Sequence, residues 1–472
     1  MSEYKKLFKN TLVMTIGNFA SKILIFIMLP FYTAVLSTTE YGAADLIFST
    51  TNLLFPIFTC LASEFVLRFT LDDKEDKRKV FSSAIAIHIV GFVILCMFSP
   101  IISKIINMDE IWLLFILYYF SNTLCMIISQ FVKGLEKIIT YSISGVINTI
   151  LVVGCNLLFL VYFNFGIIGY ISAYIIGSIV TIIFLVYRCR LWKYIAILTQ
   201  SDKKYVKRYL NYSIPMIPNS ISWWINNSLD KYILMFFWGV SLTGVYAAGY
   251  KIPSFLTIIS SIFLSAWQIS AIKDFGNEET RRFFSDIYNK YSSIVNMIAI
   301  VVILCSKLIA KILLSNDFFE AWKFAPILVY AYVFQTMSGF LGTIYTSAKK
   351  TNMMFISTAI GAIINAILNV LLIPKSGCTG AAVATAVSYL FVWLIRLFNT
   401  RYTIIKLDIL FKRDIMSYII LLITVVLVIL NTVSGYLIGL IMLIIMFILN
   451  KDIGKTIFKL GLSIVNRTKE KK

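Results

Sequence analysis

The stretch LPFYTAVLSTTEYGAAD, from Leu29 to Asp45, recurs as MFFWGVSLTGVYAAGYK, from Met235 to Lys251. A shift of 205 positions superposes identical residues, among them Phe31 on Phe236, Thr38 on Thr243, Tyr41 on Tyr246 and Ala43 on Ala248. Each copy joins one very apolar segment to the next through a short turn. Because such internal repeats are a signature of duplicated membrane proteins, the chain is predicted to contain two related halves.

The composition predicts a polytopic helical membrane protein. Of the 472 residues 59% are hydrophobic and 14% are charged, with a mean hydropathy of +0.85, far from the average of soluble domains. The formal net charge of +20 does not indicate a nucleic-acid partner, because the basic residues lie between apolar segments and form no single basic face. The seven cysteines are scattered through apolar runs and form no disulfide or metal-binding pattern.

About 20 apolar residues are needed to cross a bilayer as a helix, and this length predicts an all-α fold with fourteen spans. We expect them near residues 11–33, 43–67, 80–102, 111–132, 140–162, 167–187, 213–238, 244–270, 286–312, 322–346, 353–373, 378–399, 415–431 and 434–450. Lysines precede the first run as in a signal peptide, but no small-residue cleavage pattern follows it, so we expect this span to be retained.

Basic residues alternate between the two sides of the predicted spans. Starting with the N-terminus inside, 35 of the 43 lysines and arginines fall in cytoplasmic segments and five fall outside. This asymmetry predicts that both termini are cytoplasmic. Only Lys22, Lys231 and Lys251 are left within predicted spans, whereas Arg396 is assigned to a cytoplasmic segment.

The repeated stretches lie six spans apart, so the two halves are expected to be parallel repeats. A weaker echo, GIIGYISA from Gly166 and GCTGAAVA from Gly377, supports the same relation. The predicted organisation is a six-helix lobe over residues 1–190, a basic cytoplasmic linker over 191–212, a second six-helix lobe over 213–402, and two appended helices with a basic tail over 403–472.

The intramembrane lysines are the first candidates for ligand contact, since a lysine at the bilayer centre costs about 2.5–3.5 kcal/mol on insertion scales. Lys22 lies midway along the first span, and Lys251 lies about 10 Å into the eighth. An anionic ligand would offset their cost. The alternative is structural ion pairing, Lys22 with Asp45 and Lys251 with Asp230. Lys231 follows Asp230 directly, so the two side chains point about 100° apart on a helix.

Other polar residues admit two interpretations each. Glu64 and Arg68 are spaced i and i+4, which predicts a local ion pair, with proton or sodium coupling as the alternative role of Glu64. His88, the single histidine, is expected to form hydrogen bonds within the bundle, with proton relay as the alternative.

The seventh span, IPMIPNSISWWINNSLDKY, combines prolines with amides and indoles. Such residues are tolerated in spans that bend or line a polar cavity, and they suit contact with sugar. Hydrogen bonding between helices is the alternative. The candidate sugar contacts are Asn219, Trp223, Asn226 and Asn227.

The sequence contains no catalytic apparatus. Neither a GxxxxGK[ST] nor an HExxH pattern occurs, and the segments outside the predicted spans are too short for a nucleotide-binding or glycosyltransferase domain. We therefore expect a transporter without catalytic residues, cofactor or metal.

Three quoted stretches together resemble the Wzx-type polysaccharide-unit flippases of the multidrug/oligosaccharidyl-lipid/polysaccharide exporter superfamily. They are KNTLVMTIGNFASKILIFIMLPFYTAVLSTTEYGAADLIFS from Lys9, GVYAAGYKIPSF from Gly244 and NAILNVLLIPKSGCTGAAVATAVSYL from Asn365. The resemblance covers nearly the whole chain.

The resemblance implies a two-lobed transporter in a bacterial cytoplasmic membrane. Its substrate would be an undecaprenyl-pyrophosphate-linked oligosaccharide, moved to the outer leaflet by alternating access for surface polysaccharide biosynthesis. Lys22 and Lys251 would match the cations of the central cavity, and Asp45 would match an acidic position early in the second span. The implied partners are membrane lipids, a polysaccharide polymerase and chain-length machinery.

Two alternatives are compatible with the same residues. A lipid II flippase or a cation-coupled multidrug exporter would share the fold, and a drug exporter should depend on Asp45, Asp230 or Glu64 instead of the lysines. A polysaccharide polymerase or ligase would need a large outer loop with catalytic residues, and the predicted outer loops are short.

Overall fold

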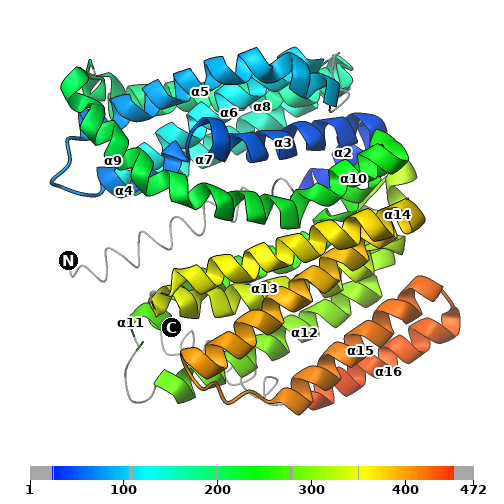
Figure 1. Ribbon diagram of the computed structural model, residues 1–472. Helices are drawn as coiled ribbons and strands as arrows, with labels where there is room; N and C mark the ends of the chain where they lie inside the picture. Colours follow the sequence, from blue (N-terminus) through cyan, green and yellow to red (C-terminus); the bar gives the residue numbers. More distant parts are fainter. Residues whose placement is uncertain are drawn as a thin grey trace, which may run out of the picture. The chain divides into compact units, whose positions relative to one another are not determined.

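The computed structural model of the protein describes residues 24, 26–105, 111–197, 199–273, 275, 280–348 and 350–450. Every regular element in this part of the chain is helical, which confirms the predicted all-α membrane fold (Figure 1). The helices form two compact units. Unit 1 contains residues 1–232 and 240–244, and unit 2 contains residues 233–239 and 245–472.

Unit 1 is built around α8, which packs on α6 and α7, while α4 packs on α6. Its elements are α2 (Leu29–Val35), α3 (Thr38–Phe58), α4 (Ala62–Thr70), α5 (Lys77–Ile105), α6 (Trp112–Gly134), α7 (Ile138–Leu157), the π-helical turn η2 (Leu158–Tyr162), α8 (Gly166–Cys189), the 3-10 turns η3 (Leu191–Tyr194) and η4 (Gln200–Asp202), α9 (Lys203–Ser213) and η5 (Ile214–Met216).

Unit 2 is built around α13, the most buried of its apolar helices, which packs against α11, α12, α14 and α15. Its elements are α11 (Lys251–Lys273), α12 (Thr280–Leu313), the 3-10 segment η6 (Asn316–Lys323), α13 (Ala325–Ser347), α14 (Thr351–Thr403), α15 (Phe411–Leu430) and α16 (Val433–Leu449). α10 (Ile217–Gly249) contributes residues to both units.

Two long helices reverse at glycines. Gly239 in α10 and Gly377 in α14 have non-helical backbone angles with positive φ, +84° and +53°, a conformation that glycine adopts without strain. The two legs of α14 form a hairpin, because the Ser388 hydroxyl donates to the Gly361 carbonyl oxygen over 3.0 Å. Gly166, the partner of Gly377 in the sequence echo, also has a positive φ of +52°.

The number of spans follows from these reversals. Nine helical segments of the described chain are long and apolar enough to cross a membrane, and the bent pair α3 and α4 makes a tenth. Separating the legs of α10 and α14 adds two more, and the shorter apolar α16 adds another. The predicted first span lies mostly outside the described residues. The prediction of about fourteen helices is consistent with this arrangement.

The break between α3 and α4 has no glycine. The two helices meet at 60°, and Cys60 and Leu61 at the junction both have positive φ. α5 passes close by, because a Cβ atom on Gly91 would lie 1.7 Å from the carbonyl oxygen of Phe58. The span predicted over residues 43–67 is therefore a broken helix, formed by α3 and α4.

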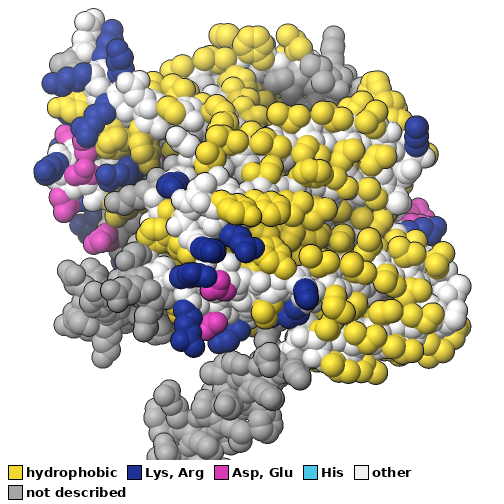
Figure 2. Space-filling model, turned by 60° about the horizontal axis from the view of Figure 1, so that its bottom comes forward, with side chains coloured by type: hydrophobic (Ala, Val, Ile, Leu, Met, Phe, Trp, Pro, Cys, Tyr) yellow, Lys and Arg dark blue, Asp and Glu magenta, His cyan; other side chains and the backbone are white. Residues whose placement is uncertain are grey.

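The surface of the helices is apolar over wide areas. Figure 2 shows hydrophobic side chains across most of the visible face, with Lys and Arg gathered in a few groups, most of them on the left of the view. Large apolar side chains such as Met97, Tyr162 and Phe236 are exposed. Hydrophobic residues facing outward are expected where lipid replaces water.

Candidate functional site: a buried ion pair in unit 1

A poorly exposed ion pair between distant segments joins Asp45 of α3 to Lys231 of α10. The Lys231 Nζ lies 2.7 Å from the Asp45 Oδ2, and the two side chains are 10% and 14% exposed. A charge-assisted hydrogen bond of this length is strong where water is scarce. Losing either partner would leave an uncompensated charge in a poorly solvated place.

The repeated stretches themselves bring α3 and α10 together. Gly42 of the first copy and Gly244 of the second lie at the helix crossing, where a Cβ atom on Gly244 would lie 1.9 Å from the Thr38 carbonyl oxygen. The hydroxyls of Thr38 and Ser241 lie 2.7 Å apart beside them. A capping box between Ser37 and Glu40 fixes the start of α3, so Asp45 falls two turns into the helix.

Further polar contacts hold the two helices in register around the ion pair. The Ser49 Oγ lies 3.4 Å from the Lys231 Nζ, and the Ser49 carbonyl oxygen accepts a 2.7 Å hydrogen bond from the indole N–H of Trp224. The Tyr232 hydroxyl lies 2.6 Å from the Thr50 Oγ1. The ammonium group is therefore positioned by a surrounding network.

Tyrosine side chains cluster on α3, α6 and α8 near the acidic partner. Phe48, one turn after Asp45 on α3, packs against Tyr118 and Tyr174 with 4.9 Å between ring centroids in each case. Tyr170 lies 5.4 Å from Tyr174 between ring centroids, and their hydroxyls are 3.5 Å apart. Such rings provide both apolar contact and hydroxyl groups.

Residues 7–272, more than half of the chain, match the family described as Polysaccharide biosynthesis protein. The chain belongs to this family. This match agrees with the polysaccharide-related family that the sequence resemblance predicted. Together with the apolar helices it identifies a multi-pass membrane protein.

Solved structures of two related groups share the fold. The lipid II flippase MurJ, in an inward closed conformation, aligns with a TM-score of 0.72 at 17% sequence identity over 95% of this chain and 99% of MurJ. An inward-facing multidrug resistance transporter of the MATE family aligns with a TM-score of 0.65 at 12% identity over 82% of this chain and 94% of that transporter.

One curated relative is the uncharacterized membrane protein MJ1068 of Methanocaldococcus jannaschii. It is 23% identical over 291 residues, which are 59% of this chain and 57% of the relative. The chain thus spans little more than half the length of this relative.

In this member of the Polysaccharide biosynthesis protein family, the lysines singled out from the sequence fall in different places. Lys231 forms an ion pair with Asp45, whereas Lys22, the partner predicted for Asp45, lies outside the described residues. Lys251 is the first residue of α11 and is half-buried in unit 2. Asp230 is 1% exposed, and its Oδ1 accepts a 2.9 Å hydrogen bond from the Lys231 backbone N–H.

The amides predicted to contact sugar lie on the first leg of α10. The side-chain amides of Asn226 and Asn227 donate to the carbonyl oxygens of Ser222 and Trp223, at 2.9 and 2.6 Å. These bonds run within the helix, one turn back along α10. Asn219 and Trp223 are half-buried near the start of the same helix.

Two predictions of polar pairing are wrong in the described part of the chain. Glu64 and Arg68 are both exposed on α4, and no ion pair joins them. His88 is 1% exposed on α5, and neither ring nitrogen has a hydrogen-bond partner among the described residues. Its ring packs against Phe120, with centroids 5.2 Å apart. Aromatic packing therefore replaces the expected hydrogen bonds.

Sequence analysis missed a buried cation, Arg396, by assigning it to a cytoplasmic segment. It lies in α14 and is 1% exposed. Its Nε donates to the Ser357 hydroxyl over 2.9 Å, its Nη2 donates to the Thr358 hydroxyl over 2.9 Å, and its Nη1 donates to the Ser338 carbonyl oxygen over 2.8 Å. The available signal was the apolar run that continues past Arg396 to Phe398.

The division into units also differs in position from the predicted lobe boundary. The predicted linker covers residues 191–212, whereas the packing divides the chain around Tyr232 and Gly244. The first leg of α10 packs with unit 1 because Trp224, Lys231 and Tyr232 are bonded to α3.

Proposed function

We propose that this protein is a flippase for an undecaprenyl-pyrophosphate-linked oligosaccharide, which it moves from the cytoplasmic to the outer leaflet by alternating access. The cell membrane would be that of a bacterium, with both termini in the cytoplasm. A polysaccharide polymerase and chain-length machinery would act on the exported unit. Membership in the Polysaccharide biosynthesis protein family supports a substrate of this class.

The buried ion pair between Lys231 and Asp45 is the observation that carries the proposal. An ammonium group in a span is costly unless an anion faces it, and in this structure Asp45 provides the carboxylate. A phosphate group offers a lysine the same point-charge partner. The substrate pyrophosphate would therefore replace Asp45 beside Lys231, and Asp45 would return when the lipid leaves.

The remaining candidate residues have assigned roles in this proposal. Lys22 and Lys251, which the resemblance matches to cavity cations, would be further substrate contacts. The sugars would contact polar groups on the first leg of α10, where indole and amide side chains suit carbohydrate. These sugar contacts would be Asn219, Trp223, Asn226 and Asn227.

The test is translocation of a fluorescent undecaprenyl-pyrophosphate oligosaccharide in proteoliposomes. The parent protein should flip the lipid, and Lys231→Ala, Lys22→Ala and Lys251→Ala should each reduce the rate by more than about tenfold, because each removes a cation proposed to contact the substrate. Lys204→Ala, which removes a surface charge, should flip like the parent. All variants must insert into the liposomes to the same extent as the parent protein and must be equally monodisperse.

A parent protein that does not flip this lipid would refute the proposed substrate. Efflux of a cationic dye would instead favour the drug-exporter alternative, which is supported by the structural similarity to a MATE transporter. In that case a proton gradient should drive efflux of a cationic dye, and Asp45→Asn or Asp230→Asn should abolish it while the lysine variants remain active.

A further inference from the structure

One face of α9 packs against the rest of unit 1. Tyr209 stacks on Phe65 with 5.4 Å between ring centroids, and its hydroxyl donates to the Glu75 carboxylate over 3.2 Å. Arg208 forms an ion pair with the same carboxylate. At the start of the helix, Asp202 pairs with Lys79 over 2.8 Å. These contacts fix the orientation of α9 in the unit.

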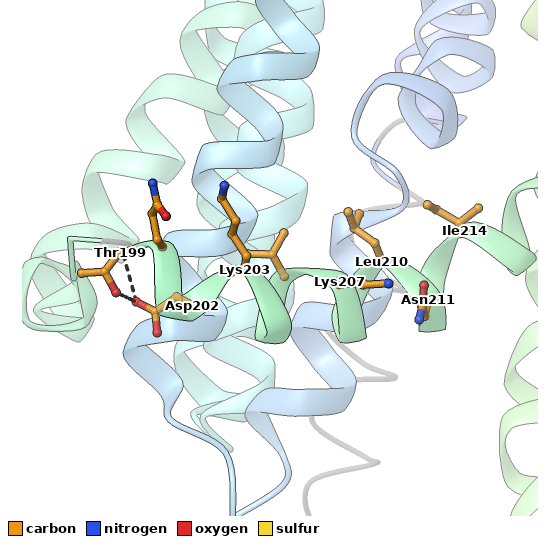
Figure 3. Close-up of a pocket in the computed structure, with 9 residues that line it drawn as sticks. Thr199, Asp202, Lys203, Lys207, Leu210, Asn211 and Ile214 are labelled. Carbon is orange, nitrogen blue, oxygen red and sulfur yellow. Dashed lines mark hydrogen bonds between the residues drawn. The ribbon is translucent and has the colours of Figure 1, made fainter.

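The other face of α9 lines an open groove of about 590 Å³. Its helical lining follows a stripe with spacing i, i+3, i+4, i+7 and i+11, formed by Lys203, Val206, Lys207, Leu210 and Ile214. Figure 3 shows Lys203, Leu210 and Ile214 rising from the same side of the helix. The stripe thus changes from basic at the start of α9 to apolar where the chain enters α10.

The two lysines of the stripe are available for a ligand. Both are exposed, and neither forms a hydrogen bond or ion pair with another described residue. Asp202, the acidic group in the lining, is already engaged by Lys79 and by Thr199, whose hydroxyl donates to it over 2.9 Å. The hydrogen bond from Lys79 lowers the pKa of Asp202 to about 2. The carboxylate therefore stays ionised, and the ammonium group of Lys79 balances its charge.

The surroundings of α9 are basic and apolar. Segments 68–79, 133–137 and 188–208 are joined by the contacts of Lys79, Arg208 and Lys137, and they contain 14 Lys and Arg against 6 Asp and Glu. The segment before α9 exposes Trp192 and Ile197, the latter at 93%. A basic amphipathic helix beside exposed apolar side chains is typical of a membrane interface.

The length of the helical run also favours a position of α9 at the membrane interface. The helical run from Lys203 to Ser261 has 59 residues and reverses at Gly239. The leg before the reversal would extend about 54 Å at 1.5 Å per residue, more than the ~30 Å hydrocarbon layer. Four of the first six residues of the run, KKYVKR, are basic, so this end of the run suits the headgroup region. Leu210 and Ile214 then lie toward the start of the membrane-spanning α10.

We infer that the groove on α9 binds an anionic glycerophospholipid, with its phosphate at Lys203 and Lys207 and its acyl chains along Leu210 and Ile214. The predicted orientation places this site in the cytoplasmic leaflet, where anionic lipids attract basic segments. The lipid would anchor the junction between the surface helix α9 and the span α10. This site is independent of the proposed substrate.

The experiment is native mass spectrometry of the full-length, delipidated protein titrated with dioleoyl-phosphatidylglycerol or dioleoyl-phosphatidylcholine. Phosphatidylglycerol should bind the parent more tightly. Lys207→Gln should weaken its binding roughly fivefold, and the double variant Lys203→Gln/Lys207→Gln should weaken it by more than about tenfold. Lys204→Gln is the matched control, because Lys204 lies over the Tyr205 ring, 5.2 Å from its centroid, outside the stripe. It should change binding less than about twofold.

Three results would overturn the inference. Equal affinity of the parent for the two lipids would exclude a headgroup site. Equal loss from Lys204→Gln and Lys207→Gln would show diffuse charge attraction. Displacement of the lipid by millimolar inorganic phosphate, with the same dependence on Lys203 and Lys207, would identify a soluble phosphate as the ligand.

Discussion

Two buried cations in this protein are stabilised in different ways. Lys231 in unit 1 faces a single side-chain carboxylate, Asp45, across two helices. Arg396 in unit 2 is held by hydroxyls and carbonyl oxygens, and no carboxylate pairs with it in the described part of that unit. A carboxylate can be exchanged for a phosphate of similar charge, whereas the acceptors of Arg396 are groups of α13 and α14 that enclose it. In the proposed mechanism Lys231 exchanges its partner, and Arg396 has a structural role.

The largest expected effect is the loss of the acidic partner. Asp45→Asn should lower the free energy of unfolding by about 3 kcal/mol, because the ammonium group of Lys231 stays buried without its counter-charge. Adding Lys231→Met should restore stability to within about 1 kcal/mol of the parent. Chemical denaturation in mixed micelles measures both values. Additive losses in the double variant would mean that the two residues do not act as a pair.

Arg396→Lys should have the next largest effect. The lysine reaches fewer acceptors than the guanidinium group, so Ser357 or Ser338 loses its donor and the free energy of unfolding should fall by about 2 kcal/mol. The translocation rate per folded molecule should remain that of the parent. A stable variant with a strongly reduced rate would contradict the structural role and remove the contrast between the two cations.

The helix crossing beside the ion pair can be tested by a small substitution. A Cβ atom on Gly42 would lie 2.4 Å from the Val240 carbonyl oxygen, so Gly42→Ala should force α3 and α10 apart at a cost of about 1–2 kcal/mol. Gly145→Ala on α7 is the control, because no atom lies within 4 Å of its Cβ position. That variant should be neutral or slightly stabilised. Equal effects in the two variants would argue against a tight crossing.

Glu64→Gln should have the smallest effect. Glu64 is an exposed carboxylate on α4 without the predicted partner, and substitutions at such positions usually change stability by less than about 0.5 kcal/mol. Translocation should be unaffected. A large loss of transport driven by an ion gradient would instead assign Glu64 to coupling and shift attention away from Lys231.

Several features of the fold could be predicted from the sequence, because they depend on local patterns. Apolar runs locate the spans, and the echo between Gly166 and Gly377 identifies two glycines that both take positive φ. The break at Cys60 and Leu61 could not be found, because neither residue favours that conformation. At this break α5 packs closely against the end of α3, with Gly91 next to the Phe58 carbonyl oxygen.

The candidate site was only half predictable. Insertion cost singles out Lys231 as an unusual residue in a span, but its partner is 186 residues away in the chain, and only the tertiary crossing selects Asp45 over Asp230. Arg396 was missed because charge counting assigns residues near span ends to loops. Its acceptors come from α13 and from the first leg of α14, and no single stretch of sequence contains them.

The most direct test of the central claim uses the double variant Asp45→Asn/Lys231→Met in the proteoliposome translocation assay. This variant removes both charges and should fold with near-parent stability. The account predicts that it inserts normally and flips the undecaprenyl-pyrophosphate oligosaccharide at less than about one hundredth of the parent rate. Translocation at the parent rate by this stable variant would show that the ion pair only holds α3 to α10, and the proposed phosphate exchange would be wrong.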